Sequence, residues 1–586
     1  MGDDALPEIF SMSAPALVTQ FERLAGAPGG VERLRELILT LAVRGKLVSQ
    51  EPSDEPASAL LQGIRAEKER RIADGRIKPD KASSEAIDQH PFEIPETWIW
   101  VSMGEVVEIV RGITFPASEK TKESGPGRIA CLRTANVQES IEWDDLLFVS
   151  RSFMGREDQL LKLHDIVMSM ANSRELVGKV ALVDQIPHAE STFGGFLGVL
   201  RPWRIDPRYA MAVLRSSYAR STLIDSSSQT TNIANISLGK LRPLPFPLPP
   251  LAEQARIVAR VDELMQLCDA LEAKGRLEAQ QHARLLETLL GTLTESTTPE
   301  ELAANWQRVA EHFDLLLDRP EAVDGLEQTV LQLAVRGLLV QQDPRDEPVS
   351  ALIERVRAEK ERLIAQGKVK RDKPLPPISD EEKPFELPEG WEWVRLSDLT
   401  QKIGAGSTPL GGREVYVPTG VKFLRSQNVW NEGLRLDGVA HIKAETHARM
   451  KGTVVISNDL LFNITGASIG RCAVVPSDFD EANVSQHVTI VRTVFPELNA
   501  FLHKVLVSRH VQQAVMDVQV GVSREGLSIA KLALFLIPLP PLEEQSRIVA
   551  RVTEIRRLCA GLRQRLAASQ ATQSRLAEAL VEAATA

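Results

Sequence analysis

Two stretches of the chain carry apolar residues in a regular alternation of four- and three-residue steps. Within residues 251–295 these positions hold Ile257, Val261, Leu264, Cys268 and Leu271, and within residues 542–586 they hold Ile548, Val552, Ile555, Cys559, Leu562 and Leu566. This spacing is typical of a coiled-coil seam. Each stretch would form a helix of roughly 65 Å at 1.5 Å per residue. A helix of that length needs a partner, so the pattern predicts that the two helices pair, with Gly275 and Gly291 as candidate breaks in the first.

Both stretches belong to a larger repeat with a period of about 290 residues. DEPASALLQGIRAEKERRIA at 54–73 returns as DEPVSALIERVRAEKERLIA at 346–365, with 14 of 20 positions identical. LAVRGKLV, PFEIPETWIWV and PLPPLAEQARIVARVDEL also return, as LAVRGLLV, PFELPEGWEWV and PLPPLEEQSRIVARVTEI. Residues 102–240 and 395–531 lie between these anchors and differ in sequence. The chain therefore consists of a repeated frame around two divergent inserts, with a pseudo-two-fold internal repeat.

The rest of the frame is predicted to be mainly helical. Val31, Leu34 and Leu41 share a helical face within residues 14–45, and Gly45 is a candidate stop. A second helix is expected over about 55–74. Proline and charged residues make 75–95 and 367–390 candidate linkers.

The inserts alternate short β-like runs with turn signals. RCAVVP at 471–476 and HVTIVRTVF at 487–495 read as strands, and each insert also has a helical stretch, near 208–224 and 498–517. An α+β class with two globular domains and long helices follows. The paired tryptophans of the frame, Trp98 and Trp100 with Trp391 and Trp393, are expected to anchor a core, and base stacking is the alternative.

Composition excludes several classes of protein. The 586 residues are too many for one core, no apolar run reaches membrane-span length, and the N-terminus lacks a secretory pattern. The four cysteines, Cys131, Cys268, Cys472 and Cys559, have no metal-ligand spacing, so a reduced cytoplasmic protein without structural zinc is expected. Cys268 and Cys559 occupy seam positions and are expected to be small core residues.

The net charge of −10 is distributed unevenly. Residues 391–541 carry 15 Lys and Arg against 13 Asp and Glu, so the acidic surplus lies mainly in the frame. A local basic face can bind phosphates on a protein that is acidic overall. This distribution permits DNA binding without demonstrating it.

The junctions and inserts resemble the specificity subunits of type I restriction–modification systems. The resemblance rests on the two PLPPL–EQ–RIV junctions, on GAGSTP at 404–409, FLRSQNV at 423–429, DLLFNITGASIGRCAVV at 459–475 and NVSQHVTIVR at 483–492, and on weaker counterparts in the first insert. It implies two target recognition domains, each reading one half of a split DNA sequence, and two long helices that pair antiparallel and set the unread spacer. It also implies a non-catalytic chain that joins two adenine-N6 methyltransferase subunits and two restriction subunits, with S-adenosylmethionine, ATP and Mg on those partners.

The resemblance divides the chain into six parts. These are an N-terminal helical segment (1–90), recognition domain 1 (91–250), a spacer helix (251–295), a connector with the second helical segment (296–383), recognition domain 2 (384–541) and a C-terminal long helix (542–586). The repeated segments 31–90 and 326–383 depart from the simplest family pattern. They either brace the helices or contact methyltransferase subunits.

Candidate DNA-contacting residues are those whose side chains suit base edges, since Arg pairs with guanine and Asn or Gln with adenine. In the first insert they are Arg133, Thr134, Asn136, Gln229, Thr230, Thr231 and Asn232, and in the second Arg425, Gln427, Asn428, Ser523 and Arg524. A turn or a phosphate contact is the alternative role of each. The Gly-rich GAGSTP and NITGASIG segments suit either tight turns or phosphate binding.

The rival functions are an enzyme and a protein-binding coiled-coil scaffold. The sequence has no [DN]PP[YF] methyltransferase motif, no GxxxxGK[ST] loop and no His-x-Glu metal signature, which disfavours the enzyme. The scaffold, or a specificity subunit of another multi-subunit DNA-modifying complex, stays open. Variable inserts on a constant frame in close relatives would favour DNA specificity.

Overall fold

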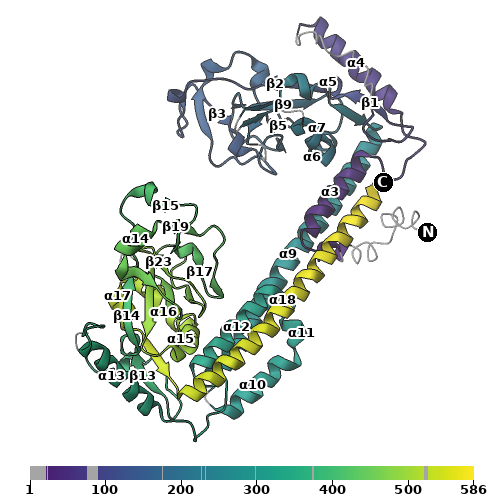
Figure 1. Ribbon diagram of the computed structural model, residues 1–586. Coiled ribbons are helices and arrows are strands. Elements are labelled where there is room, and N and C mark those ends of the chain that lie inside the picture. The colour runs from purple at the N-terminus through teal and green to yellow at the C-terminus, as the bar shows by residue number, and fades with distance from the viewer. Residues whose placement is uncertain are drawn as a thin grey trace. The chain divides into compact units, whose positions relative to one another are not determined.

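The computed structural model describes residues 21–22, 24–75, 90–173, 176–225, 228–230, 233–296, 298–371, 375–520 and 526–585 (Figure 1). The chain forms two compact units. The first unit comprises residues 1–278 together with 570–586, and the second comprises residues 279–569. Each unit holds one copy of the frame and one insert, so the sequence repeat is a repeat of folded units.

The short frame helices form where the apolar pattern predicts them. They are α3 (Gly30–Val43) and α4 (Ala57–Ala73) in the first unit, and α12 (Pro320–Val335) and α13 (Val349–Ala365) in the second. Gly45 and Gly337 follow α3 and α12 with φ of +69° and +73°, the left-handed conformation in which glycine ends a helix. Residues 14–20 of the helix expected over 14–45 lie outside the described residues.

The two long helices match their predicted bounds closely. α9 runs over Leu251–Glu295 and α18 over Leu542–Thr585. The suggestion that Gly275 and Gly291 break the first helix is wrong, because α9 is continuous through both. No neighbouring side chain lies within 4 Å of where a Cβ would stand on either glycine. A helical glycine costs about 1 kcal/mol relative to alanine, which the packing of the rest of the helix outweighs.

In the first unit, α3 packs against the first part of α9 and the last part of α18 (Figure 1). Leu34 and Ile38 of α3 share a buried core with Leu264 and Cys268 of α9, and Val581 of α18 packs against that core. In the second unit the roles of the long helices are exchanged. There α12 shares a core with Ile548, Val552 and Cys559 of α18 and with Leu286, Leu290 and Leu293 of α9. Cys268 and Cys559 are therefore core residues, as predicted.

Contacts along α12 give the directions of the long helices within the second unit. A Cβ on Gly325 of α12 would contact Leu290, and Arg336, directly after α12, donates to the carbonyl of Thr294, so α9 runs in the direction of α12. Arg563 of α18 pairs with Asp324 at the start of α12, while Arg547 of α18 pairs with Asp346, beyond its end. α18 therefore runs opposite to α12 and antiparallel to α9 in this unit.

One ion pair of the frame is reversed in charge between the two copies. In the first unit, Arg35 of α3 lies 2.8 Å from Glu272 of α9 and 2.7 Å from Asp269. At the equivalent positions of the second unit, Glu327 of α12 lies 3.0 Å from Arg563 of α18. Pairing a short helix of one copy with the long helix of the other would place like charges together at this position. The reversal therefore favours pairing within each copy.

Each insert folds as a set of small, mainly antiparallel sheets with short helices. In the first unit the strands are β1 (Ile99–Ser102), β2 (Val107–Arg111), β3 (Arg128–Leu132), β4 (Leu147–Ser150), β5 (Ile166–Ser169), β6 (Ala171–Asn172), β7 (Val180–Leu182), β8 (Ser191–Phe193), β9 (Leu197–Pro202), β10 (Ser228–Thr230), β11 (Ile233–Asn235) and β12 (Pro245–Leu248). The helices are α5 (Met103–Val106), α6 (Pro207–Arg215), α7 (Ser217–Asp225) and α8 (Leu238–Leu241). The sheet orders are β2-β9-β5-β7, β4-β3-β8, β10-β11-β6 and β1-β12.

The second unit has the corresponding arrangement. Its strands are β13 (Glu392–Arg395), β14 (Thr400–Ala405), β15 (Tyr416–Val417), β16 (Val421–Leu424), β17 (Val429–Trp430), β18 (Gly433–Leu434), β19 (Ala440–Ile442), β20 (Val454–Val455), β21 (Leu460–Asn463), β22 (Cys472–Val474), β23 (Ala482–Val484), β24 (Val488–Thr493) and β25 (Leu536–Leu539). Its helices are α10 (Pro299–Glu311), α11 (Phe313–Leu316), α14 (Ala444–Arg449), α15 (Asn499–Leu506), α16 (Arg509–Val520) and α17 (Ile529–Ala533). The order β14-β24-β21-β22 matches β2-β9-β5-β7, and β3-β8 and β16-β23 are parallel pairs. The strands predicted at 471–476 and 487–495 are β22 and β24.

The helical stretch predicted in each insert is two helices rather than one. The first breaks at Ser216, between α6 and α7, and the second breaks before Arg509, between α15 and α16. Ser216 and Ser508 each donate from the hydroxyl to the carbonyl three residues earlier, at 2.6 Å. Such a hydroxyl competes with the backbone for helical hydrogen bonds, and one stands at each of the two breaks.

The repeated junctions fasten each long helix to its insert. Trp98 Nε1 donates to the Glu253 carboxylate at 2.9 Å, and Trp391 Nε1 donates to Glu544 at 3.1 Å. Both indoles are buried, which confirms core anchoring for these two residues. Burial raises the pKa of Glu253 and of Glu544. The neighbouring Gln254 and Gln545 donate to proline carbonyls of the PLPPL turns at 3.0 and 2.9 Å, so the EQ pair holds the turn and the insert together.

Among the described residues, no helix is both long enough and apolar enough to cross a membrane.

Candidate nucleic-acid interface

The motifs of the second insert, far apart in sequence, meet at one edge of its folded domain. We call residues 406–409, 425–431, 463–471 and 485–487 the second polar edge. Thr408 Oγ1 donates to Gln486 Oε1 at 2.9 Å, and Asn463 Nδ2 donates to the Ser426 carbonyl at 2.9 Å. Thr465 Oγ1 lies 2.6 Å from His487 Nδ1. Four loops from four strand ends therefore form one continuous polar surface element.

The first domain builds an equivalent edge from residues 112–116, 133–138, 170–173 with 176–179, and 194–196, the first polar edge. Gly194 N donates to the Leu132 carbonyl at 2.9 Å, as Ser485 N does to Leu424. Met170 N donates to the Phe196 carbonyl at 2.9 Å, as Ile464 N does to His487 at 3.0 Å. These matching backbone contacts align the two edges residue by residue.

One glycine in each edge permits its loops to approach closely: Gly112 in the first edge and Gly406 in the second. A Cβ on Gly112 would lie 2.2 Å from the Gly194 carbonyl oxygen, and one on Gly406 would lie 2.1 Å from that of Val484. Gly466 and Gly470 have φ of +77° and +86° in the turn between β21 and β22. The glycines of GAGSTP and NITGASIG therefore serve close packing and a tight turn, the first of the two predicted roles. Phosphate binding by these loops stays a prediction.

The structure corrects the interpretation of Asn136 and Asn428 as base-reading residues. Asn136 is 2 % exposed and Asn428 is 1 % exposed. The side-chain oxygen of each accepts from the backbone N–H of the arginine three residues earlier, at 2.9 and 3.0 Å. The amide nitrogen of Asn136 donates to the Glu142 carbonyl at 3.0 Å, and that of Asn428 to the Arg435 carbonyl at 2.9 Å. Both side chains hold a turn, and their burial keeps them from the edge of a base.

The other four candidates in these two loops lie at the edges and differ in the solvent exposure of their side chains. Arg133 and Arg425 are half-buried, Thr134 is half-buried and Gln427 is exposed. Arg133 is paired with Asp145 at 2.7 Å. Lys122 and Arg133 together hold the pKa of Asp145 below its ordinary value. Within the described part of the chain, Arg425 has no carboxylate at ion-pair distance and its Nε is buried without a partner.

The structure describes two of the remaining six candidates. Gln229 and Thr230 lie in β10, where the backbone of Gln229 pairs with Ala234 of β11. Thr231, Asn232, Ser523 and Arg524 lie outside the described residues. The next described segments attach to the edges, because Ile236 N donates to Met170 O and Leu527 N donates to Ile464 O, each at 2.8 Å. The contacts of these candidates with DNA stay predictions.

Sequence reasoning missed three residues of the edges, Phe196, Trp430 and Arg471, and one residue beside them, Arg435. Phe196 is 69 % exposed at the first edge, where the second has His487. At the second edge the guanidinium carbons of Arg435 and Arg471 lie 3.6 and 3.7 Å from the centroid of the Trp430 ring. Trp430 directly follows FLRSQNV, so an aromatic residue beside a candidate motif was the available signal.

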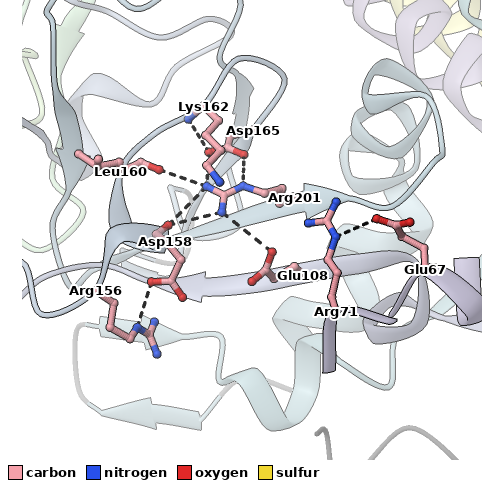
Figure 2. A network of polar contacts seen from close by, with 9 residues as sticks. All are labelled: Glu67, Arg71, Glu108, Arg156, Asp158, Leu160, Lys162, Asp165 and Arg201. Atoms are coloured by element: carbon pink, nitrogen blue, oxygen red, sulfur yellow. Dashed lines mark hydrogen bonds and ion pairs between the residues drawn. The ribbon is translucent and has the colours of Figure 1, made fainter. Parts of the chain in front are cut away.

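A buried ion pair supports each edge from within its domain. Figure 2 shows Arg201 of β9 directed at Asp165, with Nε–Oδ1 at 2.7 Å and Nη2–Oδ2 at 2.8 Å. Arg201 also donates to the Leu160 carbonyl at 3.2 Å and lies 4.0 Å from Glu108 (Figure 2). Arg492 and Asp459 repeat the paired geometry at 2.6 and 2.8 Å in the second domain. Asp165 and Asp459 immediately precede β5 and β21, the strands whose far ends reach the edges.

The chemistry of the edges suits recognition of an acceptor-rich ligand. Their described polar side chains include amides, hydroxyls, guanidiniums, the imidazole of His487 and the ammonium of Lys179, and several of these are hydrogen-bond donors. Across the described residues, no group of three or more His, Cys, Asp or Glu side chains is placed to hold a metal ion.

Comparisons with known proteins find relatives over nearly the whole chain. The sequence model described as "Type I restriction modification DNA specificity domain" matches residues 95–281 and 388–568. The specificity subunit of the type I restriction enzyme EcoAI of Escherichia coli is 35 % identical over 95 % of this chain and 94 % of its own length. That of EcoEI, also from Escherichia coli, is 33 % identical over the same shares. A solved chain from a type I restriction–modification system is 19 % identical, with a TM-score of 0.49 over 84 % of this chain and 99 % of its own.

The twice-built fold with two matched domains defines a protein with two DNA specificity domains. More narrowly, the chain belongs to the family of type I restriction enzyme specificity subunits.

Proposed function

We propose that this chain reads a bipartite, asymmetric DNA target, with one half-site at each polar edge. The main observation in support is that the same frame occurs twice in the chain, around two edges that carry different side chains. Identical edges would suit identical half-sites, whereas Phe196 on one edge and His487 at the same position on the other suit unlike half-sites. Phenylalanine contacts the thymine methyl group, while polar side chains hydrogen-bond to base edges.

The long helices are proposed to set the spacer between the half-sites. α9 and α18 each contribute residues to both units without a break. Since B-DNA advances about 3.4 Å per base pair, one added helical turn of about 5.4 Å corresponds to between one and two base pairs. Adding one turn within α9 should therefore change the spacer and leave both half-sites unchanged.

The proposed role is recognition without catalysis. In this proposal the chain acts in the cytoplasm and brings two adenine-N6 methyltransferase subunits and two restriction subunits to its target. S-adenosylmethionine, ATP and Mg would be held by those partners. Membership of the specificity-subunit family supports this division of labour.

Adenine methylation mapping tests the proposal. DNA is compared from cells with and without the gene, both carrying the methyltransferase partner. A split, asymmetric methylated motif that disappears with the gene supports the proposal and supplies the target. An unchanged set of motifs contradicts it and favours a protein-binding scaffold.

Exchange of one insert tests the assignment of edges to half-sites. Replacing residues 102–240 by those of another specificity subunit should change one half-site only. A change in both half-sites would show that the two inserts do not read independently.

A further inference from the structure

Trp430, Arg435 and Arg471 form a compact cationic stack at the second polar edge. The two guanidinium carbons lie 3.6 and 3.7 Å from the indole centroid. One face of a ring has room for one guanidinium at that distance, so the two lie on opposite faces. Stacking of this kind fixes the plane of each guanidinium and leaves its N–H groups pointing outward at the rim.

The stack belongs to the polar edge by its contacts. Trp430 Nε1 donates to the Gln427 carbonyl at 2.8 Å, next to Ser426, whose carbonyl accepts from Asn463. Arg471 ends the 463–471 loop, where its carbonyl accepts from Asn463 N at 2.9 Å. Trp430 and Arg471 thus stand on two of the loops that make the edge, and Arg435 adjoins the first of these loops because its carbonyl accepts from Asn428 Nδ2 at 2.9 Å.

The charge of the stack has little compensation within the described residues. The nearest carboxylate to Arg435 is that of Glu432 at 3.9 Å, and both side chains are more than half exposed. Arg471 has no carboxylate at ion-pair distance in the described part of the chain, and its side chain is half-buried. Two guanidiniums held on one ring repel each other, and an electron-rich ligand at the rim would relieve that repulsion.

The first domain carries a different set at the same three positions. The backbone contacts of the buried asparagines and of the loop ends equate Trp430 with Gln138, Arg435 with Glu142 and Arg471 with Lys179. There Lys179 Nζ donates to Gln138 Oε1 at 2.8 Å, and Glu142 is exposed. The frame around these positions is shared, but one copy carries two arginines stacked on a ring, and the other carries a lysine hydrogen-bonded to an amide and an exposed acid.

We infer that Arg435 and Arg471, held by Trp430, donate hydrogen bonds to the DNA half-site that the second domain reads. This inference rests on the proposed function and assigns two of the residues that contact the DNA. The guanidinium fork matches the O6 and N7 acceptors of guanine and also the oxygens of a phosphate, and both acceptors belong to the same DNA. The aromatic support places the fork before the DNA arrives, which reduces the conformational entropy lost on binding.

The test compares Arg435→Gln and Arg471→Gln with Arg449→Gln in the complete complex with its methyltransferase partner. Arg449 lies on α14 in the same domain with its side chain 80 % exposed, so it is the matched control. Methylated motifs are mapped in cells, and binding of the purified complex to its target DNA is titrated at several salt concentrations. The first half-site serves as an internal control of folding and assembly.

Two results support the inference and distinguish the acceptors. Loss of discrimination of about tenfold or more at one position of the second half-site, with the first unchanged, indicates a base contact. An unchanged motif with weaker binding, and a slope of log affinity against log salt reduced by about one per arginine, indicates a phosphate contact. Arg435→Lys and Arg471→Lys keep the charge, and they replace the glutamine variants if those fail to assemble.

The inference is overturned if both arginine variants equal Arg449→Gln in motif, affinity and salt slope. That failure is distinct from failure of the proposed function. If the proposed function fails, the unaltered chain itself directs no split methylation motif. The variants then have no wild-type motif with which they can be compared.

Discussion

The buried pair of Arg201 and Asp165 offers a stringent test of how each recognition domain is held together. We consider Arg201→Met, which removes the guanidinium and retains a long apolar side chain. The Asp165 side chain is 1 % exposed and that of Arg201 14 %. After the change, the carboxylate would still accept from the backbone N–H of Lys162, at 2.8 Å, but would have lost both hydrogen bonds from the guanidinium. The charge would thus stay buried with most of its compensation removed.

The expected loss is large because the pair is buried. Removing one partner of a buried ion pair costs about 3–5 kcal/mol, whereas an exposed pair contributes about 0–1 kcal/mol. Since 1.36 kcal/mol corresponds to a factor of ten, a loss of about 3 kcal/mol is an increase of about 150-fold in the opening equilibrium of the domain. The carbonyls of Asp158 and Leu160 also lose their contacts with Arg201, which adds to the cost.

Native-state hydrogen exchange measures this opening locally, which matters because a chain with two units does not unfold in one step. In Arg201→Met the amides of β5 and β9 should exchange about 150-fold faster. The amides of β21 and β24 in the same molecule should stay unchanged. Arg492→Met is the mirrored variant, because Arg492 pairs with Asp459 in the second domain, and it should reverse the pattern.

Exchange in β5 and β9 within tenfold of the unaltered chain would refute the reasoning, because the pair would then behave as an exposed one. Equal acceleration of both domains would refute it in another way, by showing that the two domains open together. The double variant Arg201→Met with Asp165→Leu should recover much of the loss, since replacing both partners leaves no buried charge.

Three further changes are predicted at residues outside this ion pair. Burial lowers the pKa of His503 to about 3, so the unfolded chain binds this proton below about pH 6.5 and the folded chain does not. Stability is therefore lost as the pH falls from 6.5 toward 3, by up to about 1.4 kcal/mol per pH unit, and His503→Met should remove this slope from the exchange of α15. Arg35→Glu should speed the hydrogen exchange of the α3 amides, because it removes the ion pair with Glu272. Adding Glu272→Arg should restore part of the protection of α3. If the two changes have additive effects on α3 exchange in a double-mutant cycle, the two residues do not interact directly. Gly45→Ala should destabilise α3 in thermal unfolding more than Gly75→Ala does, because both have φ near +70° but only the first Cβ would meet a proline carbon, at 2.5 Å.

The helices of the frame could be predicted because the same helical periodicity of apolar residues occurs in both copies of the repeat. The bounds of α9 and α18 were expected to within a residue, and the left-handed glycine after α3 was expected at Gly45. These features depend on local rules that the sequence displays directly. The breaks at Ser216 and Ser508 were missed because a serine hydroxyl that ends one helix is accommodated in many others, and only tertiary packing selects between the outcomes.

The charge reversal between the copies was also beyond sequence reasoning. The repeat is visible without knowing which residues face each other, and Arg35 aligns with Glu327 as one of many substitutions. Only the packing of α3 on α9 and of α12 on α18 shows that the changes at Glu272 and Arg563 compensate each other. Compensation of this kind preserves the helix contact and makes the two copies distinguishable.

The internal repeat separates residues that build an edge from residues that distinguish the half-sites. Asparagine was assigned to base reading because its side chain suits adenine, but Asn136 and Asn428 occupy equivalent positions in both domains and hold equivalent turns. A residue kept in two domains that read unlike half-sites contributes to what the domains share, which is the fold of the edge. Trp430, Arg435 and Arg471 have unlike counterparts, so the difference between half-sites has to come from positions of this second kind. It follows that Asn428→Ala should impair the second domain whatever target it is offered, whereas exchanging the stacked residues should alter which target it prefers.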